Sequence, residues 1–330
     1  MCPASSERNC RPEVTFVIPA RNAENEIGRA IDSIRRTMTL GGLQYEIVVA
    51  DHGSDDATSA VARKRGARVV DAATAKSVAE ARNRAAVESN GAVLVFVDSD
   101  VTLDETWSSA FASVRSRLDR ERIITGSQVS MPPEASRLER VWFGSSRPGA
   151  RYINSGHLIV PGSVFAELGG FDSRLVSAED HDLCNRLRGL GGMVIPDPAL
   201  RAYHHGNPRS VAEFFRREVW HGIGDASATP LRRISGVGAV ARALFTAVVV
   251  SVPAAVLLRS ALPLLVPVVA LLAVSLAASV RRSKRAPIDI PVLTALYVVY
   301  FSARCVSYWH VLLRSPSGGA SWRRDKRRGT

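Results

Sequence analysis

Two carboxylates, Asp98 and Asp100, stand one residue apart directly after an unbroken apolar run from Ala92 to Val97. Such a run is typical of a strand buried on both faces of a sheet. At the carboxyl end of that strand, the two side chains would lie where open α/β sheets bind their ligands, and they could hold a hard divalent cation. Asp104 and the helical spacing after it also fit a plain helix N-terminus. The pair alone leaves both interpretations open.

Asp51 and Arg82 are two further polar residues in positions that suit chemistry. Asp51 follows the apolar run from Tyr45 to Ala50 and opens a turn rich in Gly, Ser and Asp, where it could accept a hydrogen bond from a nucleobase. The same residue types favour turns in any protein, which is the alternative. Arg82 lies in the helical stretch 77–89, either as a solvated charge or as a partner for phosphate or for the strand-end carboxylates.

Three carboxylates, Glu179, Asp180 and Asp182, gather at the start of a later helical segment. Acidic residues are common there because they interact favourably with the helix dipole. One of them could instead act as a general base that deprotonates an attacking hydroxyl. His204 and His205 follow a short β-like segment, but their spacing does not indicate a zinc site.

The elements that must position these residues alternate between strands and helices along the first 130 residues. Because alternation of this kind builds a parallel sheet with helices on both faces, we expect an α/β fold with a doubly wound, mostly parallel sheet. The predicted strands are 14–18, 45–50, 67–70, 92–97 and 123–129. Between them we predict a helix with Ile27, Ala30, Ile31 and Ile34 on one face, a helical stretch before 67–70, and helices over 77–89 and 107–118.

Several motifs, in a fixed order, resemble family 2 glycosyltransferases with the GT-A fold. They span roughly residues 13–225 and read PARNAEN, VVADHGSDDAT, AEARNRAA, FVDSD, INSGHLIVPGSVFAELGGFD, SAEDHDLCNRL and RAYHHGN. The resemblance implies an inverting transferase that uses a nucleotide-diphosphate sugar and a divalent cation, Mg²⁺ or Mn²⁺. His52 and Asp55 depart from the residues that the family often has at these positions, which leaves the fine shape of the base pocket open.

The resemblance also assigns roles to individual residues. Asp180 would be the general base, with Glu179 orienting it or touching the acceptor, and Asp182 would be structural. Asp100 would bind the metal, Asp98 would face the ribose or the metal, and His204 rather than His205 would complete the metal shell. The donor-binding set would then be Pro19, Ala20, Glu24, Asp51, Arg82, Asp98 and Ser99, with the first four around the base and Arg82 on the diphosphate side.

The basic residues are concentrated in the last part of the chain, which also carries the long apolar segments. Residues 1–200 contain 24 Lys and Arg against 26 Asp and Glu, whereas residues 201–330 contain 19 against 5. Segments 237–258, 261–280 and 288–313 are each long enough to cross a bilayer. Cationic clusters beside apolar segments are typical of a cytoplasmic membrane face, so we expect a membrane partner and no nucleic acid.

The charge rule favours two crossings, by 237–258 and 261–280, because a third would place the basic residues 323–328 on the outer side. We therefore expect 288–313 to be re-entrant or to lie near the interface. We divide the chain into a disordered N-terminus (1–12), a nucleotide-sugar half (13–130), an acceptor half with the base (131–225) and a membrane-associated region (226–330).

We expect an enzyme at the cell membrane, with its catalytic domain in the cytoplasm and a lipid or lipid-linked glycan as acceptor. Two alternatives remain. A non-catalytic membrane scaffold could keep the nucleotide-sugar fold, although Asp98, Asp100 and Asp180 are all present. A nucleotidyltransferase would normally carry a glycine-rich basic phosphate loop, which Pro19-Ala20-Arg21-Asn22 does not supply.

Overall fold

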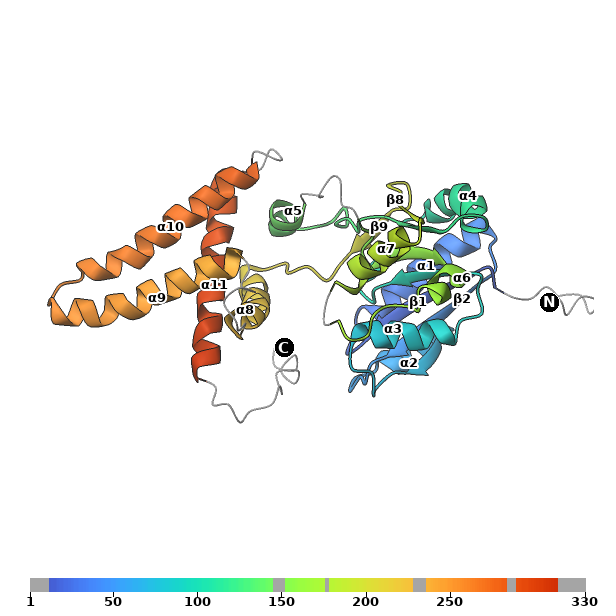
Figure 1. The fold of residues 1–330 in the computed structure, drawn as a ribbon, viewed down its shortest axis with the longest axis horizontal. Helices are drawn as coiled ribbons and strands as arrows, with labels where there is room; N and C mark the ends of the chain where they lie inside the picture. The colour runs from blue at the N-terminus through green and yellow to red at the C-terminus, as the bar shows by residue number, and fades with distance from the viewer. Residues whose placement is uncertain (1–11, 145–151, 176–177, 228–235, 284–288, 314–330) are drawn as a thin grey trace, which may run out of the picture. The chain divides into compact units, whose positions relative to one another are not determined.

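The computed structural model describes residues 12–144, 152–175, 178–227, 236–283 and 289–313, which form parts of two compact units (Figure 1). Unit 1 comprises residues 1–134 and 146–207, and unit 2 comprises residues 135–145 and 208–330. The segment 131–225, which we expect to form the acceptor half, has residues in both units. The stretch 208–225 therefore groups with the apolar helices.

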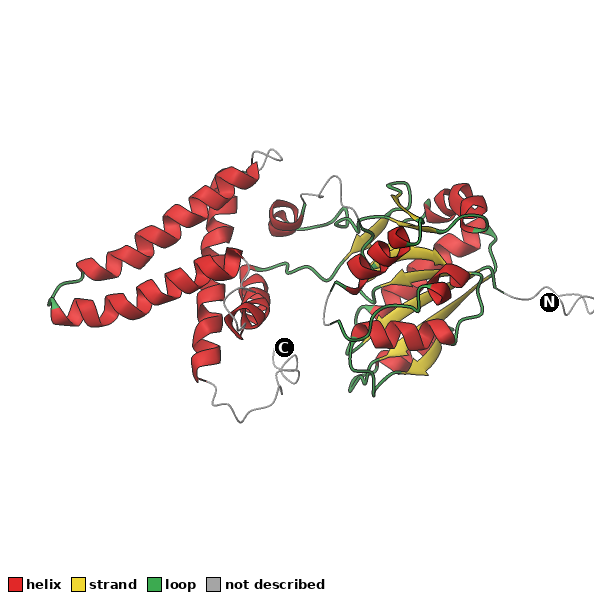
Figure 2. Cartoon of the chain, viewed as in Figure 1, coloured by secondary structure: helices red, strands yellow, loops and turns green. Residues whose placement is uncertain are grey.

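Unit 1 is built on a mostly parallel sheet, as predicted. In the described part of the chain it has seven strands in the order β3-β2-β1-β4-β7-β6-β8 (Figure 2). β7 runs antiparallel to both of its neighbours, β4 and β6. The bounds are β1 Val14–Ala20, β2 Tyr45–Asp51, β3 Arg68–Asp71, β4 Val93–Val97, β6 Ile123–Gly126, β7 His157–Pro161 and β8 Met193–Pro196.

Two layers of helices cover this sheet. Alternate strand residues point to opposite faces, so each face has its own apolar core. In β1, Phe16 and Ile18 join one apolar core, whereas Val17 joins the other. The first core takes apolar residues from α1 (Ile27–Gly41), α2 (Thr58–Lys64) and α4 (Trp107–Leu118). The second takes them from α3 (Val78–Val87), α6 (Gly162–Glu167) and α7 (Glu179–Gly189).

A separate two-stranded sheet continues directly from the Asp98–Asp100 pair. β5 (Val101–Leu103) pairs antiparallel with β9 (Ala202–His204), and Val101 lies opposite His204. The segment 200–203 was predicted to be β-like, but its pairing with residues 101–103 was not predicted. The pairing brings His204 next to Asp100 across 104 positions of sequence.

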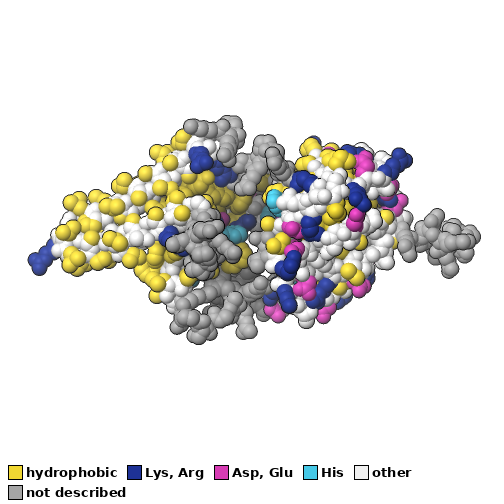
Figure 3. Space-filling view, in the orientation of Figure 1, with side chains coloured by type: hydrophobic (Ala, Val, Ile, Leu, Met, Phe, Trp, Pro, Cys, Tyr) yellow, Lys and Arg dark blue, Asp and Glu magenta, His cyan; other side chains and the backbone are white. Residues whose placement is uncertain are grey.

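Unit 2 is helical, with α5 (Arg137–Phe143), α8 (Val211–Ser227), α9 (Gly236–Leu257), α10 (Leu262–Ser283) and α11 (Ile290–Leu313). Within the described residues, α9, α10 and α11 are long and apolar enough to cross a membrane by length and composition. They match the predicted segments 237–258, 261–280 and 288–313 to within a few residues. Apolar side chains cover the visible face of α9 and α10 (Figure 3). The basic tail 323–328 lies outside the described residues.

Candidate active site

The predicted base-binding residues lie at the ends of β1 and β2. Pro19 and Ala20 are the last two residues of β1 and are buried, and Asp51 is the last residue of β2. One Asp51 oxygen accepts a hydrogen bond from the Ser54 amide at 2.9 Å, and the other accepts one from the Ser59 hydroxyl. Asp51 therefore shapes the turn that follows it while remaining partly exposed at the strand end.

Glu24 joins the loop after β1 to the loop after β2. Its carboxylate accepts a hydrogen bond from the Ala57 amide, at 2.9 Å. Asn22, which has a positive φ of 50°, makes the same connection: its amide donates to the Ser54 hydroxyl at 3.0 Å, and its side-chain oxygen accepts from Asp55 at 2.8 Å. The two loops are thus held together beside Asp51.

Arg82 connects the strand-end carboxylates to the acidic start of α7. One of its terminal nitrogens lies 2.7 Å from Asp98 Oδ1 and the other lies 2.7 Å from Glu179 Oε1. Its side chain is 4% exposed, compared with 10% for Glu179 and 33% for Asp98. The guanidinium also lies over the Phe171 ring, 5.8 Å from its centroid. A single buried cation therefore joins residues from both halves of the predicted site.

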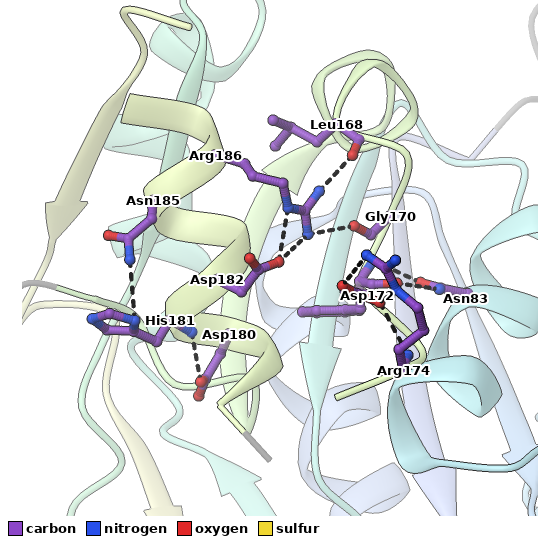
Figure 4. A network of polar contacts seen from close by, with 11 residues as sticks. Asn83, Leu168, Gly170, Asp172, Arg174, Asp180, His181, Asp182, Asn185 and Arg186 are labelled. Atoms are coloured by element: carbon purple, nitrogen blue, oxygen red, sulfur yellow. Dashed lines mark hydrogen bonds and ion pairs between the residues drawn. The ribbon is translucent and has the colours of Figure 1, made fainter. Parts of the chain in front are cut away.

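The neighbouring residue, Asn83, fixes the turn that precedes α7. Its side-chain oxygen accepts from the Phe171 amide at 2.9 Å, and its nitrogen donates to the Phe171 carbonyl at 2.7 Å. Gly170 has a φ of 73°, and a Cβ there would lie 2.7 Å from the same Asn83 oxygen. Figure 4 shows Asn83 beside Gly170 and Asp172. Both conformation and space therefore require glycine at 170.

Asp180 is held at the first turn of α7. Its two oxygens accept hydrogen bonds from the Ser155 amide at 3.2 Å and from the His181 amide at 2.7 Å. Burial raises the pKa of Asp180 above its usual range; the two amides oppose this shift, and the charge of Glu179 adds to it. Ala178, just before the helix, has a φ of 65°, which is unusual for alanine. A buried carboxylate with a raised pKa is a stronger base than a solvated one.

Asp182 makes a different set of contacts, although it lies only two residues away. It accepts from Arg186 Nε at 2.8 Å, and Arg186 also donates to the carbonyls of Leu168 and Gly170. Figure 4 shows Asp182 turned toward Arg186, while Asp180 lies at the helix start with His181. Asp182 thus ties α7 to the turn after α6, which is a structural role.

Asp100 and His204 face each other across the small sheet. His204 Nε2 lies 3.4 Å from Asp100 Oδ2, and both side chains are partly exposed. A Cβ on Gly206 would lie 2.0 Å from that Asp100 oxygen, so only glycine leaves it room. His205 donates its amide to the Asp100 carbonyl at 2.8 Å, and its ring contacts Thr102 at 2.8 Å. Of the two histidines, His204 faces the carboxylate.

The donor set around Asp100 fits a divalent cation that also binds substrate. No three His, Cys, Asp or Glu side chains converge into a metal-holding group anywhere in the described residues. Asp100 and His204 could supply two ligands, while Asp98 is engaged by Arg82. Mg²⁺ commonly takes only one or two protein ligands and completes its shell with water and substrate phosphates.

Two residues of the site received no role from the sequence. Ser155 donates its amide to Asp180 and its hydroxyl to Glu179, the latter at 3.2 Å. Gly156 lies against the other carboxylate, since a Cβ there would be 2.9 Å from Asp98 Oδ2. Both belong to the INSGHLIV motif, whose small residues were the available signal. The motif could not be placed beside Asp98 from the sequence, because that requires knowing that β7 pairs with β4.

Residues 15–125 match the family model described as Glycosyl transferase family 2. This segment is a family 2 glycosyltransferase domain. The matched residues of this domain include β1, β2, β4 and the Asp98–Asp100 pair. Its C-terminal continuation carries Asp180 and His204, which the structure brings to the same strand ends.

Relatives of the family 2 domain extend over more of the chain. The pre-mycofactocin glycosyltransferase of Mycobacterium tuberculosis is 28% identical over 238 residues, which is 66% of this chain and 47% of that protein. Glycosyltransferase AglE of Haloferax volcanii is 24% identical over 239 residues, 68% of this chain and 76% of that protein. The chain spans about half the length of the first of these curated relatives.

A solved structure shares the fold of the family 2 domain. The mannosyltransferase PcManGT from Pyrobaculum calidifontis, determined with GDP-Man and Mn²⁺, superposes with a TM-score of 0.53 at 19% identity. The match covers 91% of this chain and 87% of that one. The predicted GT-A fold, a mostly parallel sheet flanked by helices and followed here by apolar helices, is thereby confirmed.

Proposed function

We propose that this protein is an inverting glycosyltransferase that moves a sugar from a nucleotide-diphosphate sugar to a membrane-associated acceptor. The observation that carries the proposal is the contact of Arg82 with both Asp98 and Glu179. This contact joins a carboxylate of the donor side, Asp98, to Glu179, the residue next to the proposed base Asp180. An arrangement of this kind suits a reaction that requires donor and acceptor together.

On the donor side, each residue has a defined task. Asp51 and the loop held by Glu24 border the nucleobase at the ends of β1 and β2, where Pro19 and Ala20 form the floor. Asp98 and Ser99 face the ribose. Asp100 and His204 would hold Mg²⁺ or Mn²⁺, and a bound divalent cation would neutralise the charge that develops on the leaving diphosphate.

On the acceptor side, Asp180 accepts the proton of the acceptor hydroxyl. The hydroxyl oxygen then forms a bond to the anomeric carbon from the face opposite the diphosphate. The bond from that carbon to the diphosphate oxygen breaks, its electron pair leaves with the diphosphate, and the configuration inverts. Arg82 and Glu179 keep the Asp180 turn in place, while Ser155 orients both carboxylates.

The acceptor is proposed to be a lipid or a lipid-linked glycan at the cell membrane. Three apolar helices of unit 2 are long enough to reach into a bilayer, and the basic residues beside them favour the cytoplasmic face for the catalytic unit. Membrane attachment would confine the enzyme to the surface where such acceptors are found. This part of the proposal rests on the composition of unit 2.

The test is a screen of the full-length protein in detergent against UDP-, GDP- and dTDP-sugars with Mn²⁺ by thermal shift. The donor that binds is then incubated with a membrane lipid extract, and the released nucleotide is measured. Release of a nucleoside diphosphate that depends on the extract supports the proposal. Donor binding without release would favour a non-catalytic scaffold. Pyrophosphate formed from a nucleoside triphosphate and a sugar phosphate would favour a nucleotidyltransferase.

A further inference from the structure

The outer parts of α9 and α10 expose apolar side chains over most of their surface, and one narrow face of each helix is buried. Large residues at successive positions of α9 are exposed, among them Val249, Val250 and Val252, and α10 repeats the pattern. Apolar exposure over so wide a surface differs from the single apolar stripe that a protein partner would cover. The most exposed residues lie near the turn between the two helices and include Val256 (73%), Leu257 (82%) and Leu262 (70%).

The charges of this helical hairpin lie toward its ends. From 243 to 258 in α9, and from 261 to 280 in α10, the sequence contains no charged residue. Arg259 lies at the turn, whereas Arg242 and Arg282 lie toward the opposite end. Each helix has 22 residues and is therefore about 33 Å long at 1.5 Å per residue, which matches a hydrocarbon layer of about 30 Å. The surface suits a lipid bilayer.

The third apolar helix, α11, is covered along its middle by α8, a helix with both apolar and charged side chains. α8 lies alongside it: the Ser307 hydroxyl donates to the Val219 carbonyl at 2.7 Å, and Gly222 packs directly against Ser307. At the other end of the contact, a hollow of about 600 Å³ is lined by α8 and by Val298, Val299 and Ser302 of α11. α8 therefore follows the middle of α11, from about residue 298 to residue 307.

A buried ion pair fixes this contact. Arg304 of α11 lies 2.8 Å from Glu218 of α8, and their side chains are 12% and 7% exposed. α8 also carries Glu213, Arg216 and Arg217. Because α8 is fixed to α11, these charges lie at the same depth in the membrane as the part of α11 that α8 contacts.

The depth of α8 decides whether α11 can cross. Val298 is eight residues from the start of α11 and Ser307 is six from its end, so α8 would lie about 12 Å and 9 Å from the two ends of a spanning α11. That places its charges in the hydrocarbon. Each charged side chain near the bilayer centre lowers the insertion equilibrium roughly 100-fold. Together, Glu213, Arg216 and Arg217 outweigh the apolar residues that α11 would gain.

We propose that α9 and α10 cross the bilayer as a hairpin, while α11, with α8 packed along it, lies in the membrane surface and does not cross. The cations of α8 then face the lipid phosphates, and the apolar residues of the hairpin face the acyl chains. The directions of the helices agree, since Figures 1 and 2 show α11 running across the α9–α10 hairpin instead of beside it. This geometry presupposes only that unit 2 binds a membrane.

The first test maps the topology of the full-length protein with reporters that are active on one side of the membrane only. One reporter is inserted between Arg259 and Ser260, one follows Thr330, and a third precedes Met1 as the reference. We expect the reporter at 259 on the opposite side and the reporter after Thr330 on the reference side. A reporter after Thr330 on the opposite side would mean three crossings and would overturn the proposal. A reporter at 259 on the reference side would overturn it too.

A matched pair of variants tests depth. Val250→Arg places a charge in the middle of α9, whereas Val299→Arg places one in the hollow between α8 and α11. After alkaline carbonate extraction, the membrane-bound fraction should fall sharply for Val250→Arg and stay within twofold of the parent for Val299→Arg. Equal losses would place α11 as deep as α9 and sink the proposal. Release of the parent protein by carbonate would show that the hairpin is covered by protein, such as a second copy, and would sink it as well. Neither test depends on transferase activity.

Discussion

Two buried arginines, one in each unit, show how differently the same interaction is used. Arg82 and Arg304 are 4% and 12% exposed, lie 2.7 Å and 2.8 Å from carboxylates, and lie 5.8 Å and 5.0 Å from the centroids of aromatic rings. Arg82 contacts two carboxylates at the strand ends, beside partly exposed polar groups. Arg304 contacts one, between two helices in an apolar region.

A buried ion pair is by itself weak evidence for stability. The two arginines therefore have to be compared by the residues that surround them. Around Arg82, Asp98 is a third exposed, and burial raises the pKa of Asp180, the proposed general base. Around Arg304, the neighbours are Tyr300, Ser307 and Gly222, which pack and do not react. The first arginine organises a site, whereas the second fixes the position of a helix.

The largest effect is expected from Asp180→Asn, which keeps the size of the side chain but removes its basic function. Turnover should fall by roughly 10²–10⁴-fold, the usual contribution of a positioned general base. Affinity for the nucleoside diphosphate should stay within a few-fold, because Asp180 does not contact the donor side. Steady-state kinetics and calorimetry measure the two effects separately.

Asp182→Asn is the matched control. It loses the ion pair with Arg186, which holds the carbonyls of Leu168 and Gly170, so it should lower thermal stability more than turnover. If Asp182→Asn abolishes turnover while Asp180→Asn keeps it, the base has been assigned to the wrong face of α7.

A second prediction concerns Asp100 and the cation. Asp100→Ala should remove the increase in nucleoside-diphosphate affinity that Mn²⁺ provides, while affinity without metal stays the same. Gly206→Ala should act in the same direction, because its Cβ would lie 2.0 Å from Asp100 Oδ2 and displace the carboxylate. Calorimetry with and without Mn²⁺ decides this. An unchanged Mn²⁺ effect in Asp100→Ala would remove Asp100 from the metal site.

The local features of this site could be predicted from sequence. An apolar run followed by Asp98 and Asp100 predicts a strand end with carboxylates, because side-chain pattern and strand burial are short-range properties. The acidic start of α7 is visible for the same reason. The positions of the three long apolar helices α9, α10 and α11 also follow from length and composition alone.

The long-range contacts could not be predicted. Arg82 reaches Asp98 over 16 positions and Glu179 over 97, and nothing near Arg82 distinguishes a shared cation from a solvated one. β7 was not among the predicted strands, and its antiparallel direction could not be inferred because an apolar run carries no sign of direction. The packing of α8 on α11 was not predicted either. In the sequence, Arg304 only counts against a membrane-crossing segment, and nothing there pairs it with Glu218.

Arg82→Gln tests whether this arginine organises the chemistry or binds the diphosphate. We expect turnover to fall by roughly 10–100-fold, because small displacements of reacting groups are costly, while nucleoside-diphosphate affinity changes little. The positive charge of Arg82 lowers the pKa of Asp180, so its removal should raise that pKa further. Activity needs ionised Asp180 and is lost as pH falls through its pKa.

The acidic limb of the pH–rate profile of Arg82→Gln should therefore move to higher pH. Competition by the nucleoside diphosphate and by the nucleoside monophosphate separates the two roles. A selective loss of diphosphate affinity, with the pH profile unmoved, would show that Arg82 is a diphosphate ligand.

The smallest effect should come from replacing the whole ion pair of unit 2. Arg304→Leu alone leaves Glu218 buried without a partner and should destabilise by about 3–5 kcal/mol. The double variant Glu218→Leu with Arg304→Leu removes both charges and leaves apolar side chains between apolar helices. Replacements of this kind are often neutral or stabilising, so its unfolding temperature in detergent should lie close to that of the parent.

The double variant should also keep turnover within about twofold, because both residues belong to unit 2 and the proposed site is built from residues of unit 1. The corresponding removal of charge around Arg82 should lower turnover, since Asp98 and Glu179 belong to the proposed site. If the double variant of unit 2 loses turnover while it remains folded and membrane-bound, Arg304 is coupled to the chemistry after all. The distinction between the two arginines would then fail.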